Sequence, residues 1–166
     1  MRSEERLLAH GGIHALDGAK PCRLSTMEPK SALEDLAWKN ALVVRAREEG
    51  TAELMCGNAK IRLVIVKAAR LDLVLVEDGV RVGQRFTVRA VPHDRDGRAL
   101  EVGKWTELNW HSDGAVALDS DRSAGEFGIC DTCFGVHSFR ASAAGQATIS
   151  ADFSGATGSL RVTVQP

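Results

Sequence analysis

The feature that most constrains this chain is a pattern of strands that occurs twice. Residues Gly50–Val66 contain a glycine, an alternating strand, a tight turn and a strand rich in β-branched residues. Residues Gly145–Val164 follow the same order. The preceding strands also match in kind, at Ala41–Ala46 and Val136–Ala141. A unit that is used twice predicts two tandem domains of one type.

Apolar residues occupy every second position in several short segments of the second half, most clearly in Ala147–Phe153 and Leu160–Val164. This alternation puts one face of a strand in a core and the other in water. Turn-forming residues separate the segments, among them Asp94–Gly97 and Ser154–Gly155. Many short strands with regular turns predict an all-β chain built of β-sandwiches.

The repeat places the domain boundary near residue 68. We expect a reduced domain over residues 1–68 and a fuller one over residues 69–166, because a sandwich domain usually needs about 100 residues. Two short helical segments are expected in the first domain. Ser3 can cap one that ends at Gly11–Gly12, and the capping-box spacing of Ser31 and Glu34 predicts another over Ala32–Lys39.

Composition excludes several classes of protein. Hydrophobic residues make up 44% of the 166 residues and charged residues 26%, which excludes wholesale disorder. The net charge of -1 supplies no general attraction to nucleic acid or to anionic lipid. No apolar run is long enough to insert into a membrane, and Leu7–Ala9 is too short for the core of a signal peptide. The chain is therefore either cytoplasmic or a piece of a longer exported protein.

Four cysteines, Cys22, Cys56, Cys130 and Cys133, allow three disulfide pairings. Cys22 and Cys56 alternate in phase with apolar neighbours, so both are expected to point into the core of the first domain. In an exported protein we expect a disulfide between them, and buried free thiols are the alternative.

Cys130 and Cys133 have the spacing of a local disulfide that pins a long loop. A redox pair is one alternative, and zinc is another, with His137 as a third ligand and His111 as a fourth. A second Cys-x-x-Cys is absent, so we expect no metal and no other cofactor.

Residues 73–164 resemble the group-2 bacterial immunoglobulin-like domains (BIG2-like). The resemblance rests on a Val-Gly before a strand, a tryptophan segment, a Val-Ala strand and a closing glycine-led hairpin. These motifs are Arg81–Phe86, Leu108–Ser112, Ala115–Asp119, Ala144–Ala151 and Leu160–Val164. The segment Ser120–Gly135 departs from the family pattern as an insertion that contains Cys130 and Cys133.

The resemblance implies two tandem immunoglobulin-like β-sandwiches, the first one abbreviated. It also implies a non-enzymatic structural or adhesive module of a bacterial cell-surface or secreted protein, located outside the cytoplasm and part of a longer chain or assembly. The expected partner is an unidentified surface protein or carbohydrate. A carbohydrate-binding accessory domain of a larger enzyme is one alternative, and a zinc-binding or redox-sensing protein is another. If a ligand exists, its expected loop residues are Trp105, Asp131, Thr132 and Phe134.

No catalytic residue is expected, because no nucleophile, metalloprotease or phosphate-loop motif occurs in the sequence. Trp110 alternates in phase with Leu108, so it is expected in the core with its indole N–H on a buried acceptor. Asp94–Gly97 resembles the opening of a calcium loop, but Gly103 stands where the loop needs a bidentate glutamate. We therefore predict a plain turn there.

Overall fold

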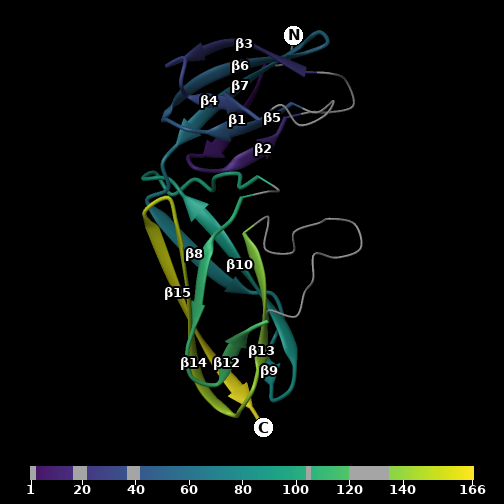
Figure 1. Cartoon of the computed structure of the whole chain (residues 1–166), viewed down its shortest axis with the longest axis vertical. Helices are drawn as coiled ribbons and strands as arrows, with labels where there is room; N and C mark the ends of the chain where they lie inside the picture. The colour runs from purple at the N-terminus through teal and green to yellow at the C-terminus, as the bar shows by residue number, and fades with distance from the viewer. Residues whose placement is uncertain (1–2, 17–21, 37–41, 104–105, 120–134) are drawn as a thin grey trace.

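The computed structural model describes residues 3–16, 22–36, 42–103, 106–119 and 135–166. The described residues form fifteen strands and contain no helix, and so none that could span a membrane. The strands build an upper and a lower body that follow one another along the long axis of the molecule, as Figure 1 shows.

The upper body pairs a four-stranded sheet with a three-stranded one. The first sheet has the order β1 (Ser3–Ala9), β7 (Ala59–Val66), β6 (Gly50–Cys56) and β3 (Cys22–Glu28). The second has the order β2 (Ile13–Ala15), β5 (Val43–Ala46) and β4 (Leu33–Asp35). All neighbours pair antiparallel except β1 and β7, which run parallel.

The lower body pairs two four-stranded sheets. One has the order β12 (Val116–Leu118), β13 (Val136–Ala141), β10 (Arg85–His93) and β8 (Arg70–Leu75). The other has the order β11 (Asn109–Ser112), β14 (Gly145–Phe153), β15 (Ala156–Gln165) and β9 (Val80–Arg81). Here β9 runs parallel to β15.

The two bodies share one strand order. Each strand from β1 to β7 has its counterpart eight strands later, from β9 to β15, and only β8 has none. Four strands face three or four in the arrangement of an immunoglobulin-like sandwich. The predicted fold class is therefore confirmed: the chain forms two tandem immunoglobulin-like sandwiches, and the first is abbreviated because it lacks a strand equivalent to β8.

The correspondence extends to individual backbone hydrogen bonds at the lower end of each sandwich. Gly11 N donates to Ala46 O at 2.8 Å, and Gly83 N donates to Ala141 O at 2.9 Å. Both glycines have positive φ, 83° and 80°, a region that favours glycine. The return bonds also match, because Ala46 N donates to Gly12 O and Ala141 N donates to Gln84 O.

The two predicted helical segments are wrong. Ser3–Ala9 is strand β1, which pairs with β7 along its whole length. Leu33–Asp35 is strand β4, and Leu33 is buried in the core. The capping signals at Ser3 and Ser31 are local, whereas pairing with a distant strand satisfies the same backbone groups and also buries apolar side chains.

Each sandwich has its own apolar core. The core of the first is centred on fully buried residues that include Leu54, Leu63 and Val44. The core of the second contains Phe86 stacked on Phe139, with ring centroids 5.8 Å apart. Ala9, from the first sandwich, is packed into this second core. The apolar packing therefore continues from one sandwich to the other.

Candidate functional site

Among the described residues, three sets of contacts join the two sandwiches at their junction. The loop that follows β10 reaches up to β1 and adds to its free edge. Ala9 N donates to Glu101 O at 3.0 Å, and Glu101 N donates to Leu7 O at 2.8 Å. Residue 101 of the second sandwich therefore extends a sheet of the first.

A charged pair reinforces this edge. The Arg6 guanidinium donates to the Glu101 carboxylate, with Nε 3.1 Å from both oxygens and Nη2 2.5 Å from Oε2. The hydrogen bond to Glu101 raises the pKa of Arg6 above its ordinary value, in spite of partial burial. A forked contact of this kind fixes orientation as well as distance.

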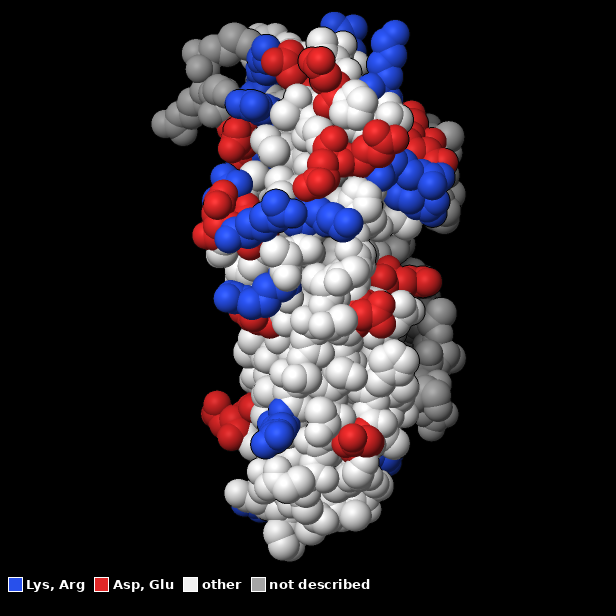
Figure 2. All heavy atoms as spheres, turned by 90° about the vertical axis from the view of Figure 1, so that its left-hand side faces the viewer, with Lys and Arg blue, Asp and Glu red and all other residues white. Residues whose placement is uncertain are grey.

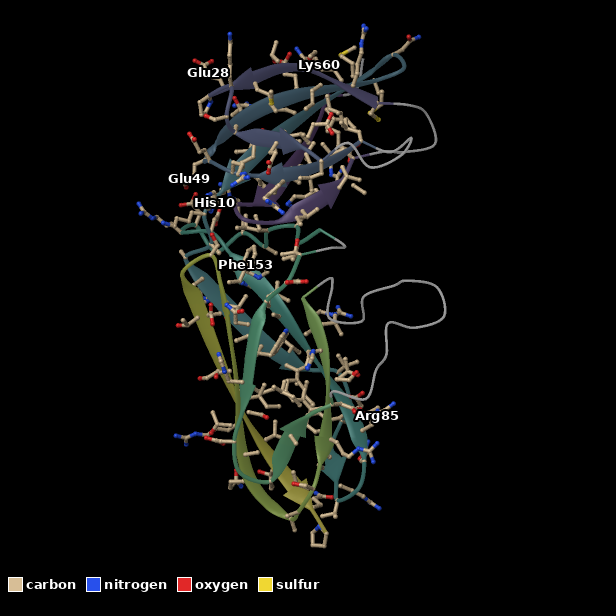
Figure 3. All side chains as sticks on the ribbon, in the orientation of Figure 1. His10, Glu28, Glu49, Lys60, Arg85 and Phe153 are labelled. Carbon is tan, nitrogen blue, oxygen red and sulfur yellow. A yellow bond between two sulfur atoms is a disulfide. The ribbon has the colours of Figure 1, made fainter. Side chains whose placement is uncertain are left out.

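His10 joins the sandwiches at a second point. Its Nε2 donates to the Arg47 carbonyl oxygen at 2.7 Å, and its Nδ1 lies 2.7 Å from Ser154 Oγ. Since a carbonyl oxygen only accepts, the neutral ring carries its proton on Nε2 and accepts the Ser154 hydroxyl proton on Nδ1. Figure 3 shows His10, Glu49 and Phe153 where the two sandwiches meet.

A third contact is a close approach of two backbones. A Cβ on Gly103 would lie 1.6 Å from Ile13 O, so only glycine fits there. Beside it, Ile13 N donates to the Oγ1 of the buried Thr106 at 2.8 Å. The three contacts join residues 6–13 of the first sandwich to two segments of the second, the loop 101–106 and the turn at Ser154, and together they hold the sandwiches in one orientation.

A hollow of about 600 Å³ lies beside the junction. It is lined by Glu49, Val66, Lys67, Ala68, Ala69, Asp94, Arg95, Asp96 and Arg98. One carboxylate oxygen of Asp94 accepts hydrogen bonds from the backbone N–H groups of Asp96 and Arg98. The other accepts a hydrogen bond from Arg98 Nε at 2.7 Å. The turn predicted at Asp94–Gly97 is thus confirmed. Within the described ranges no group of three or more metal-ligating side chains comes together.

Cys22 and Cys56 form the predicted disulfide, with their Cα atoms 4.1 Å apart. They lie directly opposite each other on β3 and β6, which are neighbours in one sheet. Both side chains are half-buried against the first core rather than fully inside it. The bond therefore ties two strands of one sheet, unlike the bond between facing sheets in antibody domains.

The other predicted site residues divide into two groups. Trp105, Cys130, Asp131, Thr132, Cys133 and Phe134 lie outside the described residues, so the ligand loop and the second cysteine pair stay predictions. His111 and His137 are described, and they do not meet. His111 is exposed on the outer face of β11, 3.9 Å from Asp152, whereas His137 stacks on the inward-facing ring of Trp110.

Trp110 is in the core as predicted, with 8% of its surface exposed. The expected acceptor for its indole N–H is not found among the described residues, and the ring nitrogens of His137 also have no hydrogen-bond partner there. Burial lowers the pKa of His137, and the nearby Asp119 carboxylate partly offsets this. A hollow of about 330 Å³ lies beside these rings.

Sequence reasoning missed the junction residues Arg6, His10, Glu101, Thr106 and Ser154. Their partners are far away in the chain, and no local pattern marks them. The one available signal was Gly11–Gly12 directly after His10, which indicated a turn but was assigned to the end of a helix.

Comparisons with known proteins show distant structural likenesses. No protein-family model matches the chain, and no curated protein matches it. Domains 5–6 of the S-layer protein SbsC are 14% identical, with 96% of this chain and 92% of that chain covered and a TM-score of 0.40. The Escherichia coli adhesin FdeC is 16% identical over 96% of this chain and 61% of that one, with a TM-score of 0.40.

A β-glucuronidase from Parabacteroides merdae is also similar, at 10% identity over 96% of this chain and 23% of that one, with a TM-score of 0.41. Likenesses as distant as these carry no argument about function. The immunoglobulin-like assignment rests on the strand order of the two sandwiches themselves.

Proposed function

We propose that this chain is a non-enzymatic structural or adhesive module of a bacterial cell-surface or secreted protein. It comprises two immunoglobulin-like domains, at residues 1–68 and 69–166, of the group-2 bacterial kind. The observation that carries the proposal is the junction, where contacts on three segments hold the sandwiches end to end.

The path of the chain supports the same role. The strands β1 and β7 run parallel, so the chain enters the first sandwich at one end and leaves it at the other. A force applied to the two ends of that sandwich therefore shears the ladder from Ser3–Lys60 to Ala9–Val66, and all of its hydrogen bonds resist together. The second sandwich also contains a parallel pair, β9 and β15, although the chain enters that sandwich through β8.

The Cys22–Cys56 disulfide supports a location outside the cytoplasm, because such bonds persist in oxidising compartments. It also suits a module that bears load, since it holds two neighbouring strands of the sheet that would be sheared.

Single-molecule pulling from the two ends of the chain tests the proposal. We expect two separate unfolding events, one for each domain. The 34-residue separation of Cys22 and Cys56 hides chain from extension, so reductant should lengthen one event by about 120 Å, at roughly 3.6 Å per residue. Extension without force peaks would show that the chain bears no load and would contradict the structural role.

A further inference from the structure

One outer sheet face of the second sandwich presents three arginines on β10 and β13. On β10, Phe86 and Val88 are buried while Arg85 and Arg89 are exposed, as the alternation of a strand requires. On the neighbouring strand β13, Arg140 is exposed next to the buried Phe139. We call the surface formed by Arg85, Arg89, Arg140, Val74 and Val76 the arginine face.

Arg85 and Arg140 are directly opposite each other across β10 and β13. Like charges in this position destabilise a sheet. Asp119 pairs with Arg85, and its carboxylate side chain is only 3% exposed. Neither Arg89 nor Arg140 forms an ion pair with a carboxylate in the part of the chain that the structure describes.

The other nearby carboxylates are already engaged. Glu77 Oε2 accepts a hydrogen bond from Thr87 N at 2.8 Å, and Asp72 pairs with Arg70 and His93. Among the described residues, therefore, no carboxylate pairs with the guanidinium groups of Arg89 and Arg140. A guanidinium fits a carboxylate through two parallel hydrogen bonds.

Exposed apolar surface lies beside these cations. Val74 is 50% exposed and Val76 is 53% exposed, and Val74 is the cross-strand partner of Arg89. In Figure 3, Arg85 lies on the side of the second sandwich that faces away from the viewer in Figure 2. The side of that sandwich seen in Figure 2 carries few charged residues. The strand register places Arg89 opposite Val74 and Arg85 opposite Arg140, so these side chains share one sheet face.

The size of the face decides between kinds of partner. The residues of the arginine face lie on three neighbouring strands, β8, β10 and β13. With strands about 4.8 Å apart and Arg85 to Arg89 spanning roughly 13 Å along β10, the face covers roughly 200 Å². A stable protein interface needs about 800 Å² on each partner. A linear polymer needs only a few contacts at each module, and its sugar rings can lie against the valines while its acidic groups meet the arginines.

We propose that the arginine face binds a carboxylated polysaccharide, a polymer of sugars that bear uronate groups. The inference deepens the proposed adhesive role, and rests on it, by naming the class of ligand. The proposed binding surface consists only of residues that the structure describes.

Affinity chromatography of the full chain on immobilised polygalacturonate tests the inference. The wild-type protein should be retained at low salt and elute as salt rises, because charge contacts at a surface are screened. The double variant Arg89→Gln/Arg140→Gln should bind roughly tenfold more weakly, as expected for the loss of two exposed charge pairs. Binding to uncharged dextran should be absent from both proteins.

The matched control is Arg95→Gln/Arg161→Gln, which removes the same charge from exposed positions on other surfaces. It should elute with the wild type. An equal loss in both double variants would assign retention to net charge and overturn the inference, as would a wild-type protein that is not retained or one that prefers dextran sulfate. The pulling experiment is independent of these outcomes, so a failure here leaves the structural role standing.

Discussion

His10 Nδ1 lies 2.7 Å from Ser154 Oγ across the junction, although 144 positions separate the two residues. Ser154 has a φ of 52°, in a region that non-glycine residues rarely adopt. It precedes Gly155 in the two-residue turn between β14 and β15, where Asn or Gly is the usual choice. Ser154 therefore contributes a hydrogen bond to the junction, although its backbone conformation in the turn is less favourable for serine than for Asn or Gly.

The coupling between His10 and Ser154 can be measured with a double-mutant cycle of His10→Ala and Ser154→Gly. We expect an interaction free energy of about 1 kcal/mol, typical of one hydrogen bond. Chemical denaturation of the four proteins provides the free energies of unfolding. Strict additivity of the two single changes would mean that the hydrogen bond contributes nothing to the junction.

Gly103→Ala should destabilise the junction, because its Cβ would lie 1.6 Å from Ile13 O. We expect a loss of roughly 2 kcal/mol or more in the free energy of unfolding, as backbone must shift to make room. Gly79→Ala is the matched control, since a Cβ at Gly79 meets nothing within 4 Å. Thermal denaturation compares the two, and a Gly103→Ala protein as stable as the control would refute the close approach.

Replacing both Cys22 and Cys56 with serine should lower the free energy of unfolding by about 2–4 kcal/mol, because the disulfide restricts the unfolded chain. The loss should fall on the first sandwich. Hydrogen exchange measured residue by residue should therefore rise in β3 and β6 and stay unchanged in β14 and β15. Uniformly faster exchange in both sandwiches would contradict separate cores.

Stability should fall at mildly acidic pH because of His14. This ring is buried, and burial lowers its pKa below the ordinary value of 6.5. At pH values between the lowered pKa of His14 in the folded protein and the ordinary value, the unfolded chain binds more protons than the folded one. Acid therefore favours unfolding. Stability is therefore full above about pH 6.5 and decreases as the pH falls below it.

The melting temperature from pH 8 to pH 5 measures this effect. His14→Gln should reduce the slope, whatever it does to the absolute stability. Part of the slope should remain, because burial also lowers the pKa of His137. A His14→Gln protein with the wild-type slope would assign the acid sensitivity to other groups.

Regular strands could be predicted from the sequence where alternation and burial agree. Ala147, Ile149, Ala151 and Phe153 are all buried on β14, as their spacing indicates. The strand β1 could not be found in this way, because Ser3, Glu4 and Glu5 mimic the start of a helix and its pairing partner lies far along the chain.

The contacts of the junction could not be predicted from the sequence for a related reason. Arg6 and Glu101 are 95 positions apart, and nothing near either residue indicates the other. In the sequence, Gly103 indicated only that a calcium-binding glutamate is missing. In the structure, it allows its own backbone to approach the backbone of Ile13. Disulfide pairing was easier to infer, since Cys22 and Cys56 both follow the apolar phase of their strands.

Residual dipolar couplings of the full chain in a weakly aligning medium test the central claim most directly. If the sandwiches are held end to end by the junction, one alignment tensor should fit the amide couplings of β1–β7 and β8–β15 together. Two tensors of clearly different magnitude would show that the sandwiches reorient independently, and would contradict a fixed junction.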